Sequence, residues 1–184
     1  MRTRLVLAAT ALGALALAAP SALAAPAPST LDGKKVTKLT LEATTVAQSN
    51  DASLVASSTE ERMQCNAPRC SVLPFVYAPA KGAKTDTLFT VKWTSSVSDI
   101  DLFIVEVGKN TRTRIASCGG SGGTSEKVFL PAGTLKKGKT YALIADFFRT
   151  SGEKVTSTVE MPGTDTVAKT VPAAADVAGV NCTL

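Results

Sequence analysis

The stretch Asp99-Ile100-Asp101-Leu102-Phe103-Ile104-Val105-Glu106-Val107 decides the fold of this chain. Alternate residues of a β-strand point to opposite faces of its sheet. One face of the stretch is therefore aliphatic, with Ile100, Leu102 and Ile104. The other face has the acidic residue Asp101, followed by the apolar residues Phe103, Val105 and Val107. Because both faces are apolar in the middle, the stretch is predicted to be an interior strand of a sheet and not an edge strand.

Other short segments repeat this alternation on both sides of the central strand. Strands are expected near residues 39–44, 72–78, 89–94, 112–117, 128–130, 140–149 and 155–161. The segment at 72–78 contains Pro74, which places it at an edge or a bulge because proline lacks an amide hydrogen. Turns rich in Gly, Pro, Ser and Lys separate the strands. The pattern predicts an all-β fold, an antiparallel β-sandwich of the jelly-roll or immunoglobulin-like kind with about seven to eight strands.

Residues 1–24 are predicted to be a secretory signal peptide. Arg2 and Arg4 give a positive start, an apolar run follows over residues 5–19, and Ala22-Leu23-Ala24 has the small residues of a cleavage site. No later stretch is long and apolar enough to predict a membrane span. We therefore expect a secreted, extracellular bacterial protein with no membrane segment in its mature form.

The mature chain is expected to form one domain. Residues 25–34 are rich in Pro and Ala and are interpreted as a flexible leader. Residues 35–184 are interpreted as a single β-sandwich domain, with a C-terminal tail that is tied back by Cys182. A chain of this length is long enough for one domain with a substantial core.

The charge of the chain is moderately positive. It has 20 Lys and Arg, 15 Asp and Glu, and no His, so the formal net charge is +5. Loss of Arg2 and Arg4 with the signal peptide leaves +3. The densest basic cluster, Lys136-Lys137-Gly138-Lys139, lies in a predicted turn, where basic residues are ordinary solvated surface. We therefore expect no nucleic-acid partner.

The four cysteines form an even set, which in an exported chain predicts disulfides. Cys65 and Cys70 enclose only four residues and are expected to pair, which leaves Cys118 to pair with Cys182. The other two connectivities stay open from the sequence. A zinc site is the alternative, but the chain has neither C-x-x-C spacing nor histidine.

No catalytic residues are assigned. Gly119-Gly120-Ser121-Gly122-Gly123 matches the G-x-S-x-G motif, which requires a histidine base and a following helix. The chain has no histidine, and no helix is predicted after the motif. We therefore expect the protein not to be an enzyme, and an enzyme that relies on carboxylates or lysine is a minor alternative.

Asp99 and Asp101 are two residues apart and therefore lie on one face of the central strand. The simplest interpretation is that they are polar strand-end residues packed against turn hydroxyls or amides. The functional alternative is a calcium site, because hard cations bind clustered oxygen ligands. No other cofactor is expected.

Residues 86–161 resemble the bacterial pre-peptidase C-terminal (PPC-like) domain. The resemblance depends on Asp99-Ile100-Asp101-Leu102-Phe103-Ile104, on the Gly/Ser-rich loop after Ser117, and on Thr140-Tyr141-Ala142-Leu143-Ile144. It implies a β-sandwich that is not catalytic, that associates with substrates or surfaces, and that in some members binds calcium. Of the family's calcium ligands, only Asp99 and Asp101 are carried over.

Two functions from different classes compete. The first is a secreted, non-enzymatic binding or adhesion module for an extracellular polymer, a cell surface or a protein partner. The alternative is a secreted protease inhibitor that uses the loop between Cys65 and Cys70, with Arg69 as the recognition residue and Ser71 beside it. A rigid loop next to a disulfide suits inhibition because little entropy is lost on binding.

Overall fold

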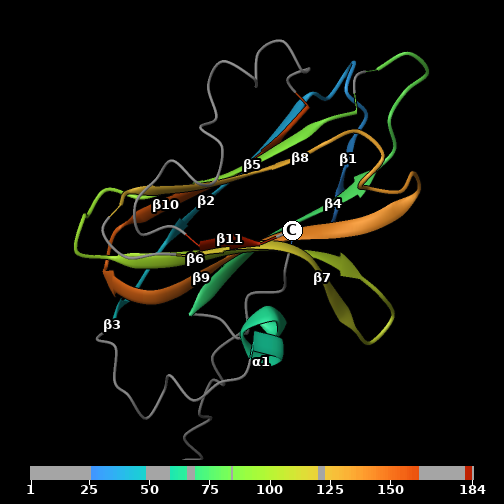
Figure 1. Ribbon diagram of the computed structural model, residues 1–184. Helices are drawn as coiled ribbons and strands as arrows, with labels where there is room; N and C mark the ends of the chain where they lie inside the picture. Colours follow the sequence, from blue (N-terminus) through green and yellow to red (C-terminus); the bar gives the residue numbers. More distant parts are fainter. Residues whose placement is uncertain are drawn as a thin grey trace, which may run out of the picture.

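The computed structural model describes residues 26–48, 59–65, 69–83, 85–119, 123–161 and 181–183. Two β-sheets pack face to face as a sandwich, as the alternation predicted (Figure 1). Among the described residues, eight strands have six residues or more, and three have only two or three. No described helix is long and apolar enough to cross a membrane.

The larger sheet, called sheet A, contains the central strand. Its order is β1 (Ser29–Leu31), β4 (Cys70–Tyr77), β9 (Lys139–Ser151), β6 (Asp99–Val107), β7 (Arg112–Gly119) and β11 (Asn181–Thr183). A two-residue strand, β3 (Ala47–Gln48), pairs with the end of β9. The pairs are antiparallel except β1 with β4. Strand β6 lies between β9 and β7, so the prediction of an interior strand is confirmed.

The smaller sheet, called sheet B, has four antiparallel strands. Their order is β2 (Lys38–Thr44), β10 (Lys154–Glu160), β5 (Thr87–Lys92) and β8 (Ser125–Leu130). The hairpin from β9 to β10 and the crossing from β7 to β8 join the two sheets.

The main core lies between the sheets. Ile100, Leu102 and Ile104 of β6 are fully buried there, together with Leu143 of β9 and with Trp93 after β5. The alternation predicted this face of β6 correctly. Burial of a Leu or Ile side chain stabilises the fold by about 1.5–3 kcal/mol, and this is why the aliphatic face is held inward.

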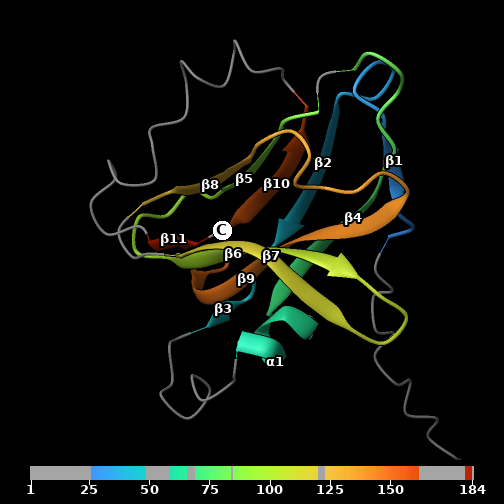
Figure 2. The same cartoon turned by 45° about the vertical axis from the view of Figure 1, so that its right-hand side comes forward.

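A second apolar cluster lies on the outer face of sheet A. Phe103 and Val105 of β6 contact Ile144 and are covered by Met63 and the Cys65–Cys70 pair. Met63 belongs to α1 (Thr59–Gln64), which packs on the side of sheet A that faces away from sheet B (Figure 2). Residues 48–62 are polar and rich in Ser and show no helical periodicity, which favours a loop, but residues 59–62 belong to this short helix.

The expected flexible leader is also partly ordered. Ser29–Leu31 forms β1, and Leu31 is fully buried against the main core. β1 pairs with Phe75–Tyr77, so the first half of β4, including Pro74, has β9 as its described neighbour. Three residues are too few to show an alternation, and this is why β1 was not predicted.

Candidate functional site

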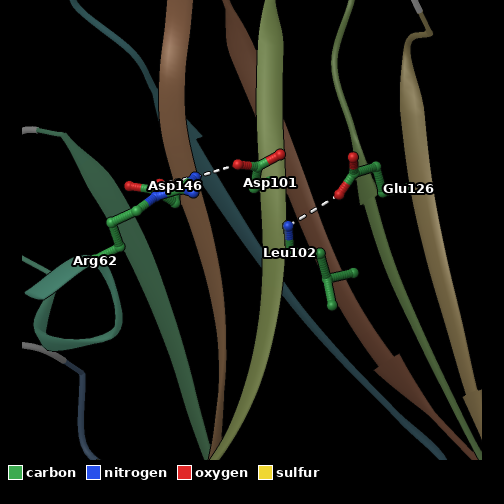
Figure 3. A network of polar contacts seen from close by, with 5 residues as sticks. All are labelled: Arg62, Asp101, Leu102, Glu126 and Asp146. Carbon is green, nitrogen blue, oxygen red and sulfur yellow. Dashed lines mark hydrogen bonds and ion pairs between the residues drawn. The ribbon is translucent and has the colours of Figure 1, made fainter. Parts of the chain in front are cut away.

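The first candidate residues, Asp99 and Asp101, lie at the start of β6. On β9, the Cα partner of Asp101 is Asp146, and the Cα partner of Asp99 is Arg149. Asp101 accepts a hydrogen bond from Arg62 of α1, and the same guanidinium lies 2.6 Å from Asp146 (Figure 3). Asp101 also packs against Gly119 of β7 so closely that a Cβ there would collide with its carboxylate.

Arg62 neutralises this pair of carboxylates. Its Nε donates a hydrogen bond of 2.7 Å to Asp146, and its guanidinium lies over the rings of Phe103 and Phe148, at 5.2 and 5.5 Å. Burial alone would lower the pKa of Arg62, but the two carboxylates outweigh it and raise the pKa above its usual value. The cluster is therefore a partly buried ion network that fixes α1 to sheet A.

No described hydrogen bond connects Asp99 to this network. Its Oδ1 atom is buried without a hydrogen-bond partner. Burial raises the pKa of Asp99 above its usual value, and the nearby charge of Asp101 raises it further. Within the described ranges, no group of three or more acidic, His or Cys side chains could hold a metal ion. The calcium site stays a prediction, and calcium binding at Asp101 would have to displace Arg62.

A second buried carboxylate, Glu126 of β8, reaches from sheet B to sheet A. It is 2% exposed, and it accepts a hydrogen bond of 2.9 Å from the backbone N–H of Leu102 (Figure 3). The contact joins the two sheets at the first half of β6. Sequence reasoning did not single out Glu126, because only the packing of the sheets brings β8 to β6.

Glu153, in the hairpin between β9 and β10, is a third buried carboxylate. It accepts hydrogen bonds from the backbone N–H groups of Thr94 (3.1 Å) and Ser95 (2.6 Å) and from the hydroxyl of Ser98. Its own backbone N–H donates to the Thr45 hydroxyl. Burial alone would raise the pKa of Glu153, but the donated hydrogen bonds outweigh it and lower the pKa below its usual value. Glu153 therefore holds the turn that leads into β6.

The second candidate is the loop bounded by Cys65 and Cys70. The predicted Cys65–Cys70 disulfide is confirmed. Arg69 is exposed, and its carbonyl accepts a hydrogen bond of 2.8 Å from the N–H of Phe147. Ser71 lies within β4, where its Cα partner is Ala145 of β9. The backbone of Arg69 and Ser71 is therefore held against β9. Residues 66–68 lie outside the described part of the chain.

The predicted pairing of Cys118 with Cys182 agrees with the strand register. β11 and β7 are antiparallel, with Cys182 directly opposite Cys118. Cys118 is disulfide-bonded. Directly opposed residues of an antiparallel pair have a Cα separation within the range of a disulfide.

The outer face of sheet B was not singled out by sequence reasoning. Of the described elements, α1 is the one that packs on an outer sheet face, and it contacts β7 and β9 of sheet A. In each strand of sheet B, every second residue points into the core. The residues between them form the outer face of the sheet. Most residues of this face carry a hydroxyl group or a charge: Thr40, Glu42, Thr44, Thr90, Lys92, Ser125, Lys127, Lys154, Thr156 and Thr158. Leu88 and Phe129 are Cα partners on the same face and are apolar.

Comparison with known proteins does not assign this chain to a family. No protein-family model matches it, and no curated protein matches it. The resemblance of residues 86–161 to the PPC-like domain therefore stays a prediction.

Proposed function

We propose that the protein is a secreted, non-enzymatic binding module that presents the outer face of sheet B to an extended extracellular polymer or cell surface. The observation that carries this proposal is the contrast between the two outer faces. α1, the disulfide and the Arg62 network cover the apolar outer face of sheet A, whereas no described element covers the outer face of sheet B. That face is largely polar and rich in hydroxyl groups.

Four buried or partly buried carboxylates have structural partners, which supports a role without catalysis. Asp101 and Asp146 bind Arg62, Glu126 binds the backbone of Leu102, and Glu153 binds the turn before β6. Each of these acids has a structural hydrogen bond or ion pair, and the chain has no histidine that could act as a base. The resemblance of residues 86–161 to the PPC-like domain is in keeping with such a binding role.

The protease-inhibitor alternative receives less support from the geometry. A substrate-like inhibitor needs an exposed extended segment that an enzyme can bind along its length. Ser71 and the residues that follow it pair with β9 instead. The alternative is tested by measuring whether the protein inhibits a trypsin-like enzyme near a one-to-one ratio and whether Arg69→Ala removes that inhibition.

Retention on insoluble polymers tests the proposed function. The mature protein is incubated with bacterial cell walls, chitin and cellulose, and the bound fraction is measured. We expect retention on at least one carrier. Thr156→Tyr, in the middle of the outer face of sheet B, should reduce that retention, because the bulky ring would project from the surface that the polymer covers.

Thr113→Tyr is the matched control, because Thr113 is exposed on β7 of sheet A. It should bind like the wild type. Absence of retention on every carrier would contradict the binding role. Equal loss in both variants would contradict the assignment to sheet B.

A further inference from the structure

We infer that β2 is the interface of a homodimer, in which two copies of the chain join their sheets B edge to edge into one continuous sheet. The partner is a second copy of this chain, related to the first by a two-fold axis. This inference goes beyond the proposed function and does not depend on it.

β2 has one edge that no described strand covers. It is the terminal strand of sheet B, and its described neighbour in that sheet is β10 (Figure 2). Its seven residues pair with β10 in one unbroken register. The end strands of sheet A, β1 and β11, have three residues each, and β8, at the other end of sheet B, contacts β7. Of the described strands at the end of a sheet, β2 therefore offers the longest row of backbone groups.

The hydrogen bonds at the two ends of β2 show which backbone groups face the open edge. The N–H of Thr45 donates a bond of 2.8 Å to the carbonyl of Glu153, and the N–H of Met161 donates a bond of 2.8 Å to the carbonyl of Thr37. Hydrogen-bonded pairs of an antiparallel ladder recur at every second residue. The odd-numbered residues of β2 therefore bond to β10. The remaining residues direct their N–H and C=O groups toward the open edge, where they form a template for another strand: Lys38, Thr40, Glu42 and Thr44.

Charge complementarity selects one register for a second copy of β2. In a two-fold dimer, residue i faces residue j and residue j faces residue i. A two-fold axis at Thr40 places Lys38 of each copy opposite Glu42 of the other. An axis at Leu41 pairs Glu42 with Thr40 and Lys38 with Thr44, and an axis at Glu42 places two carboxylates opposite each other. The register centred on Thr40 therefore gives two symmetric ion pairs, and opposite charges in direct cross-strand positions stabilise a sheet.

The charged neighbours within one chain fit this arrangement. Glu160 of β10 is ion-paired with Lys38 at 3.6 Å, and Lys154, the Cα partner of Thr44, is a diagonal neighbour of Glu42. Across the joined strands the order is Glu160, then Lys38, then Glu42 of the second copy with Lys154 beside it. Opposite charges therefore alternate through the interface.

The inward side of β2 also gains from a second copy. Leu39 and Leu41 pack against the main core but are only partly buried, whereas Val155 and Val159 of β10 are completely buried. In the register centred on Thr40, Leu39 of each copy faces Leu41 of the other, at a position without direct hydrogen bonds where side chains approach most closely. Dimer formation would therefore remove apolar surface from water as well as pair the backbone.

Sedimentation velocity of the mature protein over a wide range of concentration tests the dimer. We expect a reversible equilibrium between monomer and dimer. Lys38→Glu alone and Glu42→Lys alone each turn both ion pairs into repulsions and should raise the dissociation constant of the dimer by about tenfold or more. The double variant Lys38→Glu/Glu42→Lys and an equimolar mixture of the two single variants both restore opposite charges, so dimers should form again.

Lys109→Glu is the matched charge control, because Lys109 is exposed in the turn between β6 and β7. It should dimerise with a dissociation constant within about twofold of the wild type. Melting curves of all variants check that they are folded.

Thr40→Cys tests the position of the two-fold axis. Directly opposed residues of a hydrogen-bonded pair have Cα atoms about 5.5 Å apart, which is within the range of a disulfide. Under mild oxidation this variant should form a covalent dimer, in which peptide mapping recovers the two introduced cysteines linked to each other. Thr44→Cys is the control, because Thr44 is exposed on the same strand but faces Val36 of the second copy in this register.

Three outcomes would overturn the inference. A protein that remains monomeric at every concentration has no such interface. A dimer that tolerates both charge reversals and is not cross-linked through Thr40→Cys uses another surface. Equal cross-linking through Thr44→Cys would contradict the register. Retention of a monomeric protein on insoluble polymers would overturn the dimer alone and leave the proposed function standing, whereas a dimer without retention would contradict only the proposed function.

Discussion

At the scale of single residues, the buried carboxylates hold the fold together across long sequence distances. Glu153 collects donors from a turn that precedes it by more than fifty residues, and Glu126 spans the two sheets. An acid that accepts several hydrogen bonds in its ionised form keeps a low pKa in the folded state. Such an acid stabilises the fold at neutral pH and loses that effect in acid.

Glu153→Ala tests this role. Removal of the carboxylate leaves the N–H groups of Thr94 and Ser95 and the hydroxyl of Ser98 without this acceptor. The expected loss in the free energy of unfolding at pH 7 is about 2 kcal/mol, measured by urea denaturation. Because the folded pKa of Glu153 is lowered, the difference between wild type and variant should shrink as the pH falls below the ordinary pKa of glutamate and through the lower folded pKa.

Glu160→Ala is the control for Glu153, because Glu160 forms a half-exposed ion pair with Lys38 on the surface. Its unfolding free energy should stay close to that of the wild type. A Glu153→Ala variant that is as stable as Glu160→Ala at pH 7 would contradict the structural role of Glu153.

At the scale of elements, α1 has too few residues to be stable as a helix by itself. It is held by Met63 in the outer apolar cluster, by the disulfide at Cys65, and by Arg62 between two acids. Arg112 adds a hydrogen bond of 2.7 Å to the carbonyl of Met63 near the end of the helix. Tertiary contacts therefore hold α1 in place.

Arg62→Met tests the ion network under α1. The variant leaves Asp101 and Asp146 as neighbouring, largely buried carboxylates without their cation. The expected loss in the free energy of unfolding at pH 7 is about 3 kcal/mol. Burial already raises the pKa of Asp146, and loss of the cation should raise it further, so the loss should diminish as the pH falls and Asp146 becomes protonated.

Adding Asp101→Asn and Asp146→Asn to Arg62→Met should restore most of the lost stability, because the uncompensated charges are removed. Lys139→Met is the surface control, since it breaks the exposed ion pair with Glu106 and should have little effect. If the triple variant is no more stable than Arg62→Met at pH 7, the charge of the two acids is not the cause of the loss.

At the scale of the whole molecule, β11 pairs with β7 and so attaches residues 181–183 to sheet A (Figure 1). We predict that Cys118 pairs with Cys182 in the native protein. Peptide mapping under non-reducing conditions should recover these two cysteines in one linked fragment and Cys65 with Cys70 in another. A fragment that links Cys65 to Cys118 would contradict both the pairing and the strand order at this edge.

The sequence by itself determined the β-sandwich, the interior position of β6 and the Cys65–Cys70 bridge. These features follow from local patterns: the alternation of Ile100, Leu102 and Ile104, and a pair of cysteines separated by a short loop. Only the tertiary structure decided the partner of Asp101, which is an arginine 39 positions away, and the contact of Glu126 with the backbone of Leu102. Local alternation tells which face a residue occupies, but the order and register of the strands decide which residues of that face become neighbours.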